Sequence, residues 1–330
     1  MFKNKKNIFI GVFVAICFAV FAILVASMAG SKAEVYEETG ESVDTAGNIK
    51  ELPYTVLILG KDKVSGLTDV MMIASFDSEN NRMCAVQIPR DTYAEYSENH
   101  KKLNTATKVL GGEGELCRFL SDALGVRIDG YLSLELEGFR RAVDVIGGVE
   151  IELDKTMYYN DPDQDLYIYL PKGKQLLDGK KAEMLVRYRS TYARGDLDRL
   201  DVQKRFVRAF FSKFKSSVSI SSIYEIATSL FPYIDTNIPI TTFISLGIKA
   251  LKMDDDALNL VTLPGEDVKS NSGGSYYVMS AEPTWNILEE FFVTKGEQID
   301  KNKLFEHPTD DNFKKIYARR EDIQQSYADN

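Results

Sequence analysis

The stretch that decides the fold is residues 54–91, YTVLILGKDKVSGLTDVMMIASFDSENNRMCAVQIPRD. Residues 54–60 are a short apolar run, which is typical of a buried strand. Residues 70–77 and 82–88 predict two more strands, and the turn-forming residues 78–81 between them predict a hairpin. We therefore expect three consecutive strands near the centre of a sheet.

The hairpin gathers charged side chains at one edge of this sheet. Asp69 stands at the entrance of one strand and Arg90 just beyond the exit of its neighbour, so antiparallel pairing puts both at the same end. Asp62 follows the first strand and is joined to Asp69 by a short loop, and Asp91 follows Arg90. These four residues are expected to cluster, which is a signal of a functional site.

Beyond residue 91, helical and strand patterns alternate. The expected helices cover residues 115–124, 136–146, 176–187 with Asp178 as N-cap, 196–214, 220–231, 242–252 and 280–293, and the expected strands cover 149–153 and 257–263.

The helix over residues 196–214 is the most informative. Its inward stripe also carries Arg199 and Gln203, one turn apart at its N-terminal end. Because burial of a polar group without a partner is costly, these two either bond to neighbouring protein groups or line a pocket. Upstream arginines favour the pocket: Arg187, Arg189 and Arg194. The apolar members of the stripe are Phe206, Val207, Phe210 and Phe214.

The N-terminus predicts a membrane anchor. Residues 8–29 are 22 mostly apolar positions, enough for a helix of roughly 30 Å. Lysines precede this run and acidic residues follow it, so the positive-inside rule places the N-terminus in the cytoplasm and the bulk outside the cell. A cleaved signal peptide is the rival, with 27–29 as its cleavage site, but its apolar core would be only about 7–15 residues long.

The chain thus divides into a basic start (1–7), a single-pass anchor (8–29), an acidic tether (30–52), an extracellular domain (53–294) and a charged appendage (295–330).

Net charge disfavours nucleic acid as a partner. The chain has 40 basic and 49 acidic side chains, a net charge of −9, and without Lys3, Lys5 and Lys6 the remaining 37 basic side chains leave −12. Nucleic-acid affinity rests mainly on phosphate neutralisation. Any anion site must therefore be a local group of Arg and Lys.

Cys84 and Cys117 lie in apolar segments beyond the predicted anchor. They either pair in a disulfide or stay as buried thiols, and the apolar surroundings favour buried thiols.

Several common catalytic motifs are missing. The sequence has no Gly-x4-Gly-Lys loop, no His-Glu-x-x-His helix and no Gly-x-Ser-x-Gly elbow, and its two histidines are His100 and His307. Carboxylates and arginines remain. Asp62 and Asp69 offer the oxygen ligands that Mg²⁺ prefers, and arginine forks suit a pyrophosphate. The alternative is that all of these are surface ion pairs, which contribute little.

A family resemblance decides between these alternatives. Taken together and in this order, eight stretches resemble the LytR-CpsA-Psr family of cell-wall glycopolymer ligases, over residues 54 to about 293. They are LILGKD (57–62), TDVMM (68–72), VQIPRDTY (86–93), KKLNTA (101–106), GFRRAVDVIGGVEI (138–151), LLDGKKAEMLVRYRS (176–190), GDLDRLDVQ (195–203) and TLPGE (262–266).

The resemblance implies an α/β fold with a mixed central β-sheet flanked by helices in α/β/α layers, and a hydrophobic tunnel for a polyprenyl tail. It implies transfer of a glycopolymer from a polyprenyl-pyrophosphate carrier to peptidoglycan of a Gram-positive wall, through a phosphodiester, with Mg²⁺ (or Mn²⁺) as cofactor. The alternatives are a polyprenyl-pyrophosphate hydrolase, or a non-catalytic lipid-binding anchor that regulates envelope assembly.

Residue roles carry over at matching positions. Asp62 and Asp69 would hold the metal, and Asp91 would either orient Arg90 or act as a base, so Arg90 and Asp91 are the catalytic candidates. The residues that would bind the pyrophosphate or sugar are Arg90, Lys102, Asn104, Arg187, Arg189, Arg199 and Gln203.

The sequence departs from the family pattern twice. Residues 67–70 read Leu-Thr-Asp-Val where the family usually has Arg-Ser-Asp-Thr, and residues 202–204 read Val-Gln-Lys instead of Arg-Gln-Gln. These changes predict a weaker grip on phosphate or a different donor.

Overall fold

The computed structural model describes residues 41–43, 49–61, 66–161, 166–188, 196–218, 226, 229–254, 256–270, 274–296, 298–300 and 303–304. The predicted membrane anchor, residues 8–29, lies outside these residues. Within the described part of the chain, no helix combines the length and apolar character needed to cross a membrane.

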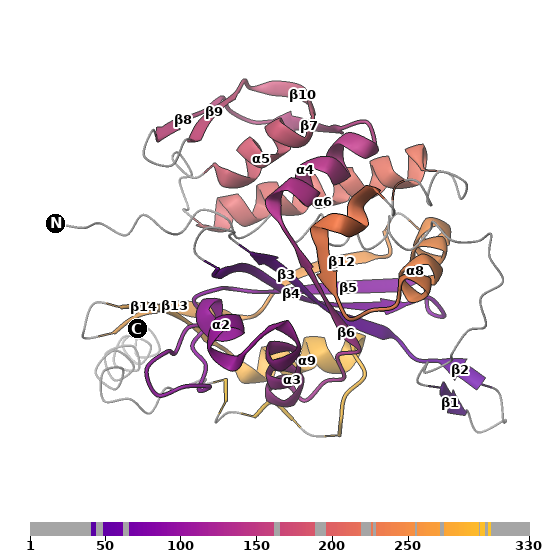
Figure 1. Ribbon diagram of the computed structural model, residues 1–330, viewed down its shortest axis with the longest axis vertical. Helices are drawn as coiled ribbons and strands as arrows, with labels where there is room; N and C mark the ends of the chain where they lie inside the picture. Colours follow the sequence, from indigo (N-terminus) through magenta and orange to yellow (C-terminus); the bar gives the residue numbers. More distant parts are fainter. Residues whose placement is uncertain are drawn as a thin grey trace, which may run out of the picture.

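A six-stranded mixed sheet forms the centre of the molecule (Figure 1). In spatial order the strands are β11 (Ile234–Thr236), β6 (Gly130–Leu134), β3 (Tyr54–Lys61), β4 (Thr68–Asp77), β5 (Arg82–Ile88) and β12 (Leu258–Thr262). The predicted hairpin is present, because β4 pairs with both β3 and β5 in antiparallel fashion. The flanking strands come from later in the chain: β6 runs parallel to β3, and β12 runs parallel to β5.

Helices cover both faces of this sheet, as Figure 1 shows. Side chains that alternate along each strand feed two separate cores. Ile58 and Met72 belong to the core under one helical layer, whereas Leu59 and Met71 belong to the core under the other. The first layer holds α4 (Leu136–Val145), α5 (Gly179–Arg187), α6 (Asp196–Ser217) and α8 (Ile240–Lys252); the second holds η1 (Leu103–Thr105), α2 (Ala106–Leu110), α3 (Glu113–Leu124) and α9 (Ala281–Phe291). The expected layered α/β fold is confirmed.

Four two-stranded sheets and one short helix complete the described structure. They are β1 (Glu41–Val43) with β2 (Ile49–Glu51), β7 (Val149–Leu153) with β10 (Gly173–Leu177), β8 (Met157–Asp161) with β9 (Leu166–Leu170), β13 (Gly265–Lys269) with β14 (Ser275–Met279), and η3 (Phe231–Tyr233). The first pair lies within the predicted tether.

The α5 region corrects one prediction. Leu176 and Leu177 belong to β10 rather than to a helix, because they pair with β7, in which Leu177 lies opposite Val149. The helix starts after Asp178, whose side chain accepts a hydrogen bond from the Lys181 backbone N–H at 2.8 Å, as expected of an N-cap.

Two details concern the cores. Cys84 and Cys117 are both free and buried, and burial raises the pKa of their thiols to about 12 and about 11. The prediction of buried thiols is confirmed. Ile299 and Leu304 are buried in the core beneath α3 and α9, so packing against the domain continues beyond the predicted boundary at residue 294.

Candidate active site

Asp69 and Arg90 meet at one end of the central sheet. Arg90 Nη1 donates to Asp69 Oδ1 at 2.7 Å. Both residues are buried, since Arg90 is 3% exposed and Asp69 is 4% exposed. The register of β3 and β4 shifts so that Gly60 pairs with Val70 while Lys61 pairs with Thr68, which leaves Asp69 as the extra residue. A bulge of this kind breaks the alternation of side chains and re-aims one of them. The predicted meeting of Asp69 with Arg90 is confirmed.

A tight turn after β5 holds Arg90 in place. The Thr92 N–H and hydroxyl both donate to the Pro89 carbonyl, at 3.0 and 2.6 Å. The Arg90 carbonyl accepts from the Asn104 N–H at 3.0 Å, which ties the turn to η1. The Asn104 side-chain oxygen is buried and accepts no hydrogen bond from the described part of the chain. It is therefore a polar group available to a ligand or a water molecule beside Arg90.

Asp91 faces Lys102, not Arg90. Lys102 Nζ lies 3.0 Å from Asp91 Oδ1 and 5.2 Å from the centre of the Tyr276 ring. Both charged side chains are about one quarter to one third exposed. The Asp91 carbonyl accepts from the Tyr277 N–H at 2.9 Å, so the β13–β14 hairpin supports this part of the site. Of the two roles predicted for Asp91, orienting Arg90 has no contact to support it in the described residues.

Arg187 is positioned by an acidic residue that the sequence reasoning missed. Arg187 Nη1 lies 2.9 Å from Glu183 Oε1, one turn earlier on α5. Arg140 of α4 binds the other carboxylate oxygen of Glu183 at 2.5 Å. The spacing of Glu183 and Arg187, four residues apart, was a usable signal for this pair. Glu183 is buried and held by Arg140, and it thereby fixes the orientation of the Arg187 guanidinium.

The end of β3 carries a further charged pair. Lys61 forms an ion pair with Glu113 at the start of α3. Burial lowers the pKa of Lys61, while the negative charge of Asp235 opposes that shift. Next to this pair, the hydroxyls of Thr68 and Thr107 share a hydrogen bond of 2.7 Å. The first departure from the family pattern, residues 67–70, thus keeps at Thr68 a hydroxyl that helps to hold α2 to the sheet.

The side chains of the remaining predicted site residues are not among those that the structure describes. Asp62, Arg189 and Arg194 lie outside the described residues. Arg199 and Gln203 lie in α6, but their side chains are not among those described. The apolar stripe of the same helix is confirmed, because its four predicted members are all buried: Phe206, Val207, Phe210 and Phe214.

Of the two predicted metal ligands, Asp62 and Asp69, the structure describes only Asp69. Asp69 supplies a carboxylate, the ligand type that Mg²⁺ prefers, and so fits this role, while its Oδ1 already accepts from Arg90. Within the described residues no group of three or more His, Cys, Asp or Glu side chains is placed to hold a metal ion. Metal binding at this end of the sheet stays a prediction.

The chain belongs to the LytR_cpsA_psr family, whose pattern matches residues 8–291. This confirms the resemblance drawn from the eight motifs.

Curated relatives carry two kinds of name. The chain is 26% identical over 263 residues to the polyisoprenyl-teichoic acid–peptidoglycan teichoic acid transferase TagV of Bacillus subtilis, covering 77% of this chain and 66% of TagV. It is 29% identical to the corresponding transferase TagU of Bacillus mycoides, covering 73% of this chain and 78% of TagU. It is also 26% identical to the regulatory protein MsrR of Staphylococcus aureus, covering 72% and 73%.

Solved structures show the same fold. The crystal structure of Bacillus subtilis TagV superposes with a TM-score of 0.61 at 25% identity, covering 73% of this chain and 98% of that one. Protein gbs0355 from Streptococcus agalactiae superposes with a TM-score of 0.66 at 22% identity, covering 77% and 93%.

Proposed function

We propose that this protein is a membrane-anchored, extracellular transferase that moves a glycopolymer from a polyprenyl-pyrophosphate carrier to peptidoglycan through a phosphodiester. Residues 8–29 would be its single membrane span, with the N-terminus in the cytoplasm. Family membership and the names of TagV and TagU support this reaction class. The observation that carries the proposal is the buried contact of Asp69 with Arg90 at the end of the sheet, inside two of the family motifs.

The charges around this sheet end suit a pyrophosphate donor. An arginine never loses its charge and presents parallel N–H donors that match phosphate oxygens. Arg187 is oriented for this purpose by Glu183, and Lys102 stands partly exposed beside Asp91. Arg189, Arg199 and Gln203 complete the proposed donor-binding group. Positive charge arranged in advance stabilises the charge that develops on a departing phosphate.

In the proposed reaction a hydroxyl of the acceptor sugar attacks the phosphorus that bears the glycan. A new phosphorus–oxygen bond forms as the bond to polyprenyl phosphate breaks, and polyprenyl phosphate leaves. Asp91 takes the hydroxyl proton, since its carboxylate is partly exposed and Lys102 fixes its orientation. Asp62 and Asp69 would hold Mg²⁺, which when bound neutralises negative charge on the phosphates.

The test uses the full-length protein in detergent with a lipid-pyrophosphate-linked glycan and peptidoglycan strands. We expect release of polyprenyl phosphate and formation of a glycan phosphodiester, both lost on chelation of Mg²⁺ and in Arg90→Ala. Arg205→Ala is the control, because Arg205 is not one of the proposed site residues and forms an exposed ion pair with Asp154.

Product analysis separates the competing functions. Free glycan phosphate in place of the phosphodiester would mean hydrolysis. Binding of the lipid without any turnover would favour the regulatory role that the name of MsrR suggests for that relative. Full turnover in Arg90→Ala would contradict the proposed site.

A further inference from the structure

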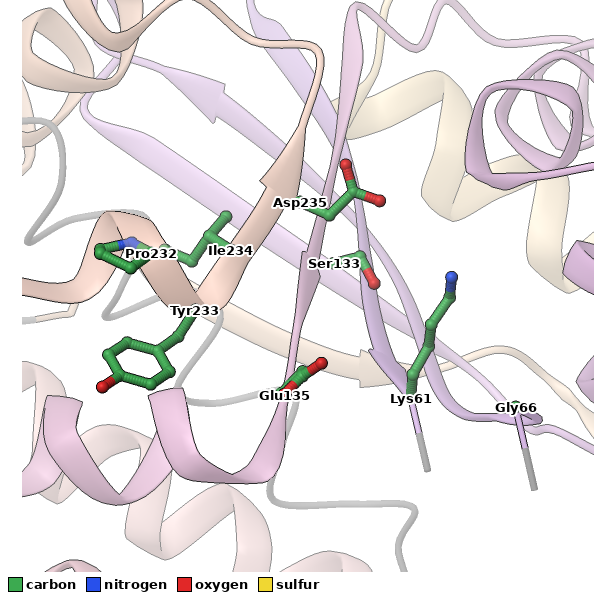
Figure 2. Close-up of a pocket in the computed structure, with 8 residues that line it drawn as sticks. All are labelled: Lys61, Gly66, Ser133, Glu135, Pro232, Tyr233, Ile234 and Asp235. Carbon is green, nitrogen blue, oxygen red and sulfur yellow. The ribbon is translucent and has the colours of Figure 1, made fainter. Parts of the chain in front are cut away.

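A hollow opens at the same end of the sheet as Asp69 and Arg90. It has a volume of about 570 Å³ and is bounded by β3, β6, β11 and η3 (Figure 2). This is within the size range of small-ligand pockets in proteins. We call it the β6–β11 cavity; its lining residues are Lys61, Gly66, Ser133, Glu135 and Pro232 to Asp235.

Strand pairing sets the polar side chains of this cavity beside each other. Ser133 of β6 lies directly opposite Asp235 of β11 in the antiparallel register, so both side chains stand on the same face of the sheet. Tyr131, two residues before Ser133, reaches Asp235 Oδ1 with its hydroxyl at 3.5 Å. Figure 2 shows the polar ends of Ser133, Asp235 and Lys61 gathered around the ends of these strands.

The Ser133 hydroxyl is available to a ligand in the cavity. Ser133 is only 5% exposed, and no residue in the described part of the chain makes a hydrogen bond with its hydroxyl. Buried polar groups normally have a partner, because leaving one unsatisfied is costly. Since Ser133 lines the cavity, a ligand that enters there can form a hydrogen bond with this hydroxyl.

The charges of the cavity select the class of ligand. Among the described lining residues, Glu135 and Asp235 carry carboxylates and Lys61 carries an ammonium. Lys61 is already ion-paired with Glu113, so the described lining is acidic. A phosphate-bearing ligand would be repelled. Uncharged sugar hydroxyls suit this lining, because they donate to carboxylates and also pair with a serine or tyrosine hydroxyl.

We infer that the β6–β11 cavity binds an uncharged amino-sugar unit of the glycan strand that accepts the transferred polymer. This inference rests on the proposed transferase function and assigns its acceptor side. β6 and β4 are separated only by β3, so the cavity lies about 10 Å from Asp69 at a strand spacing of about 4.8 Å. The acceptor would thus approach this end of the sheet over the acidic lining of the cavity, and the anionic donor would approach it over the arginines.

Binding is tested first, by calorimetry on the full-length protein in detergent. The probes are a tetramer of N-acetylglucosamine and, as an anionic counterpart, an oligomer of glycerol phosphate. We expect the sugar tetramer to bind and the anionic oligomer not to bind. Asp235→Asn and Ser133→Ala should each weaken the tetramer on the order of tenfold, the effect of losing one hydrogen bond to a charged or buried group. Asp256→Asn, at an exposed acid in the turn before β12, is the matched control.

The second test measures the kinetics of transfer. In the transfer assay, Asp235→Asn should raise KM for the glycan acceptor about tenfold while KM for the lipid-linked donor changes less than twofold. Equal tetramer affinity in Asp235→Asn, Ser133→Ala and Asp256→Asn would overturn the inference, as would tighter binding of the glycerol phosphate oligomer. If the wild type binds the tetramer at this cavity but cleaves no donor, the transferase function fails while the cavity assignment stands.

Discussion

Replacing Asp69 with alanine tests whether the Asp69–Arg90 pair holds the sheet end together. The change leaves the guanidinium of Arg90, which is 3% exposed, without its partner at 2.7 Å. Arginine does not escape the problem by losing its proton, because the guanidinium stays charged in proteins. Removing one partner of a buried ion pair costs about 3–5 kcal/mol. For a domain of this size we expect the melting temperature to fall by about 6–20 °C.

An exposed pair of the same chemistry and length provides the control. Arg205 Nη2 lies 2.8 Å from Asp154 Oδ2, and the two side chains are 40% and 73% exposed. Asp154→Ala should cost less than about 1 kcal/mol, because water replaces much of the interaction. The geometries of the two pairs match, so a difference between the variants reports burial.

Fluorescence of Trp285 follows both melts, since it is the single tryptophan of the chain and packs against the core under α9. Equal melting temperatures for Asp69→Ala and Asp154→Ala would refute the reasoning. A large fall in the melting temperature of both variants would also refute it.

Three further predictions follow from burial. Burial raises the pKa of Asp129 above its ordinary value of 3.8, so the folded state binds that proton more tightly; stability should fall as pH rises through this range, and Asp129→Asn should flatten the curve of melting temperature against pH. Phe210→Ala should cost about 3–5 kcal/mol in thermal unfolding, whereas Phe231→Ala, at a side chain 40% exposed, should cost less than about 1 kcal/mol. Cys84 and Cys117 should resist thiol reagents until the protein unfolds, and rapid labelling in peptide mass spectra would contradict their burial.

Local patterns predicted the elements whose cause is local. The three strands β3, β4 and β5 were expected to within two residues, because alternation and a turn of polar residues at 78–81 are readable from neighbours in the chain. The buried stripe of α6 followed from the helical period in the same way. The strand β6 and the short strand β11 were missed. They pair across about a hundred residues, as Ile234 with Leu134, and so carry little signal of their own.

In the candidate site, too, contacts set by local sequence were predictable and contacts between distant segments were not. The contact of Asp69 with Arg90 was predictable, because both flank one hairpin whose register alone brings them together. The orientation of Arg187 was not, since the carboxylate of Glu183 is also held by Arg140, 43 residues earlier on another helix. Likewise, Asp91 was expected beside Arg90 but is held by Lys102, because the turn after β5 points adjacent residues to different neighbours.

The sequence by itself determined the family, the hairpin at the centre of the sheet and the inventory of acids and arginines available for phosphate chemistry. Only the tertiary structure decided which of these groups touch and how deeply each is buried. It also decided that β6 and β11 line a cavity near Asp69 whose described lining is acidic. The physical reason is range: strand and helix periodicity are set by residues a few positions apart. Burial and ion pairing depend on segments that become neighbours only when the sheet and its two helical layers pack.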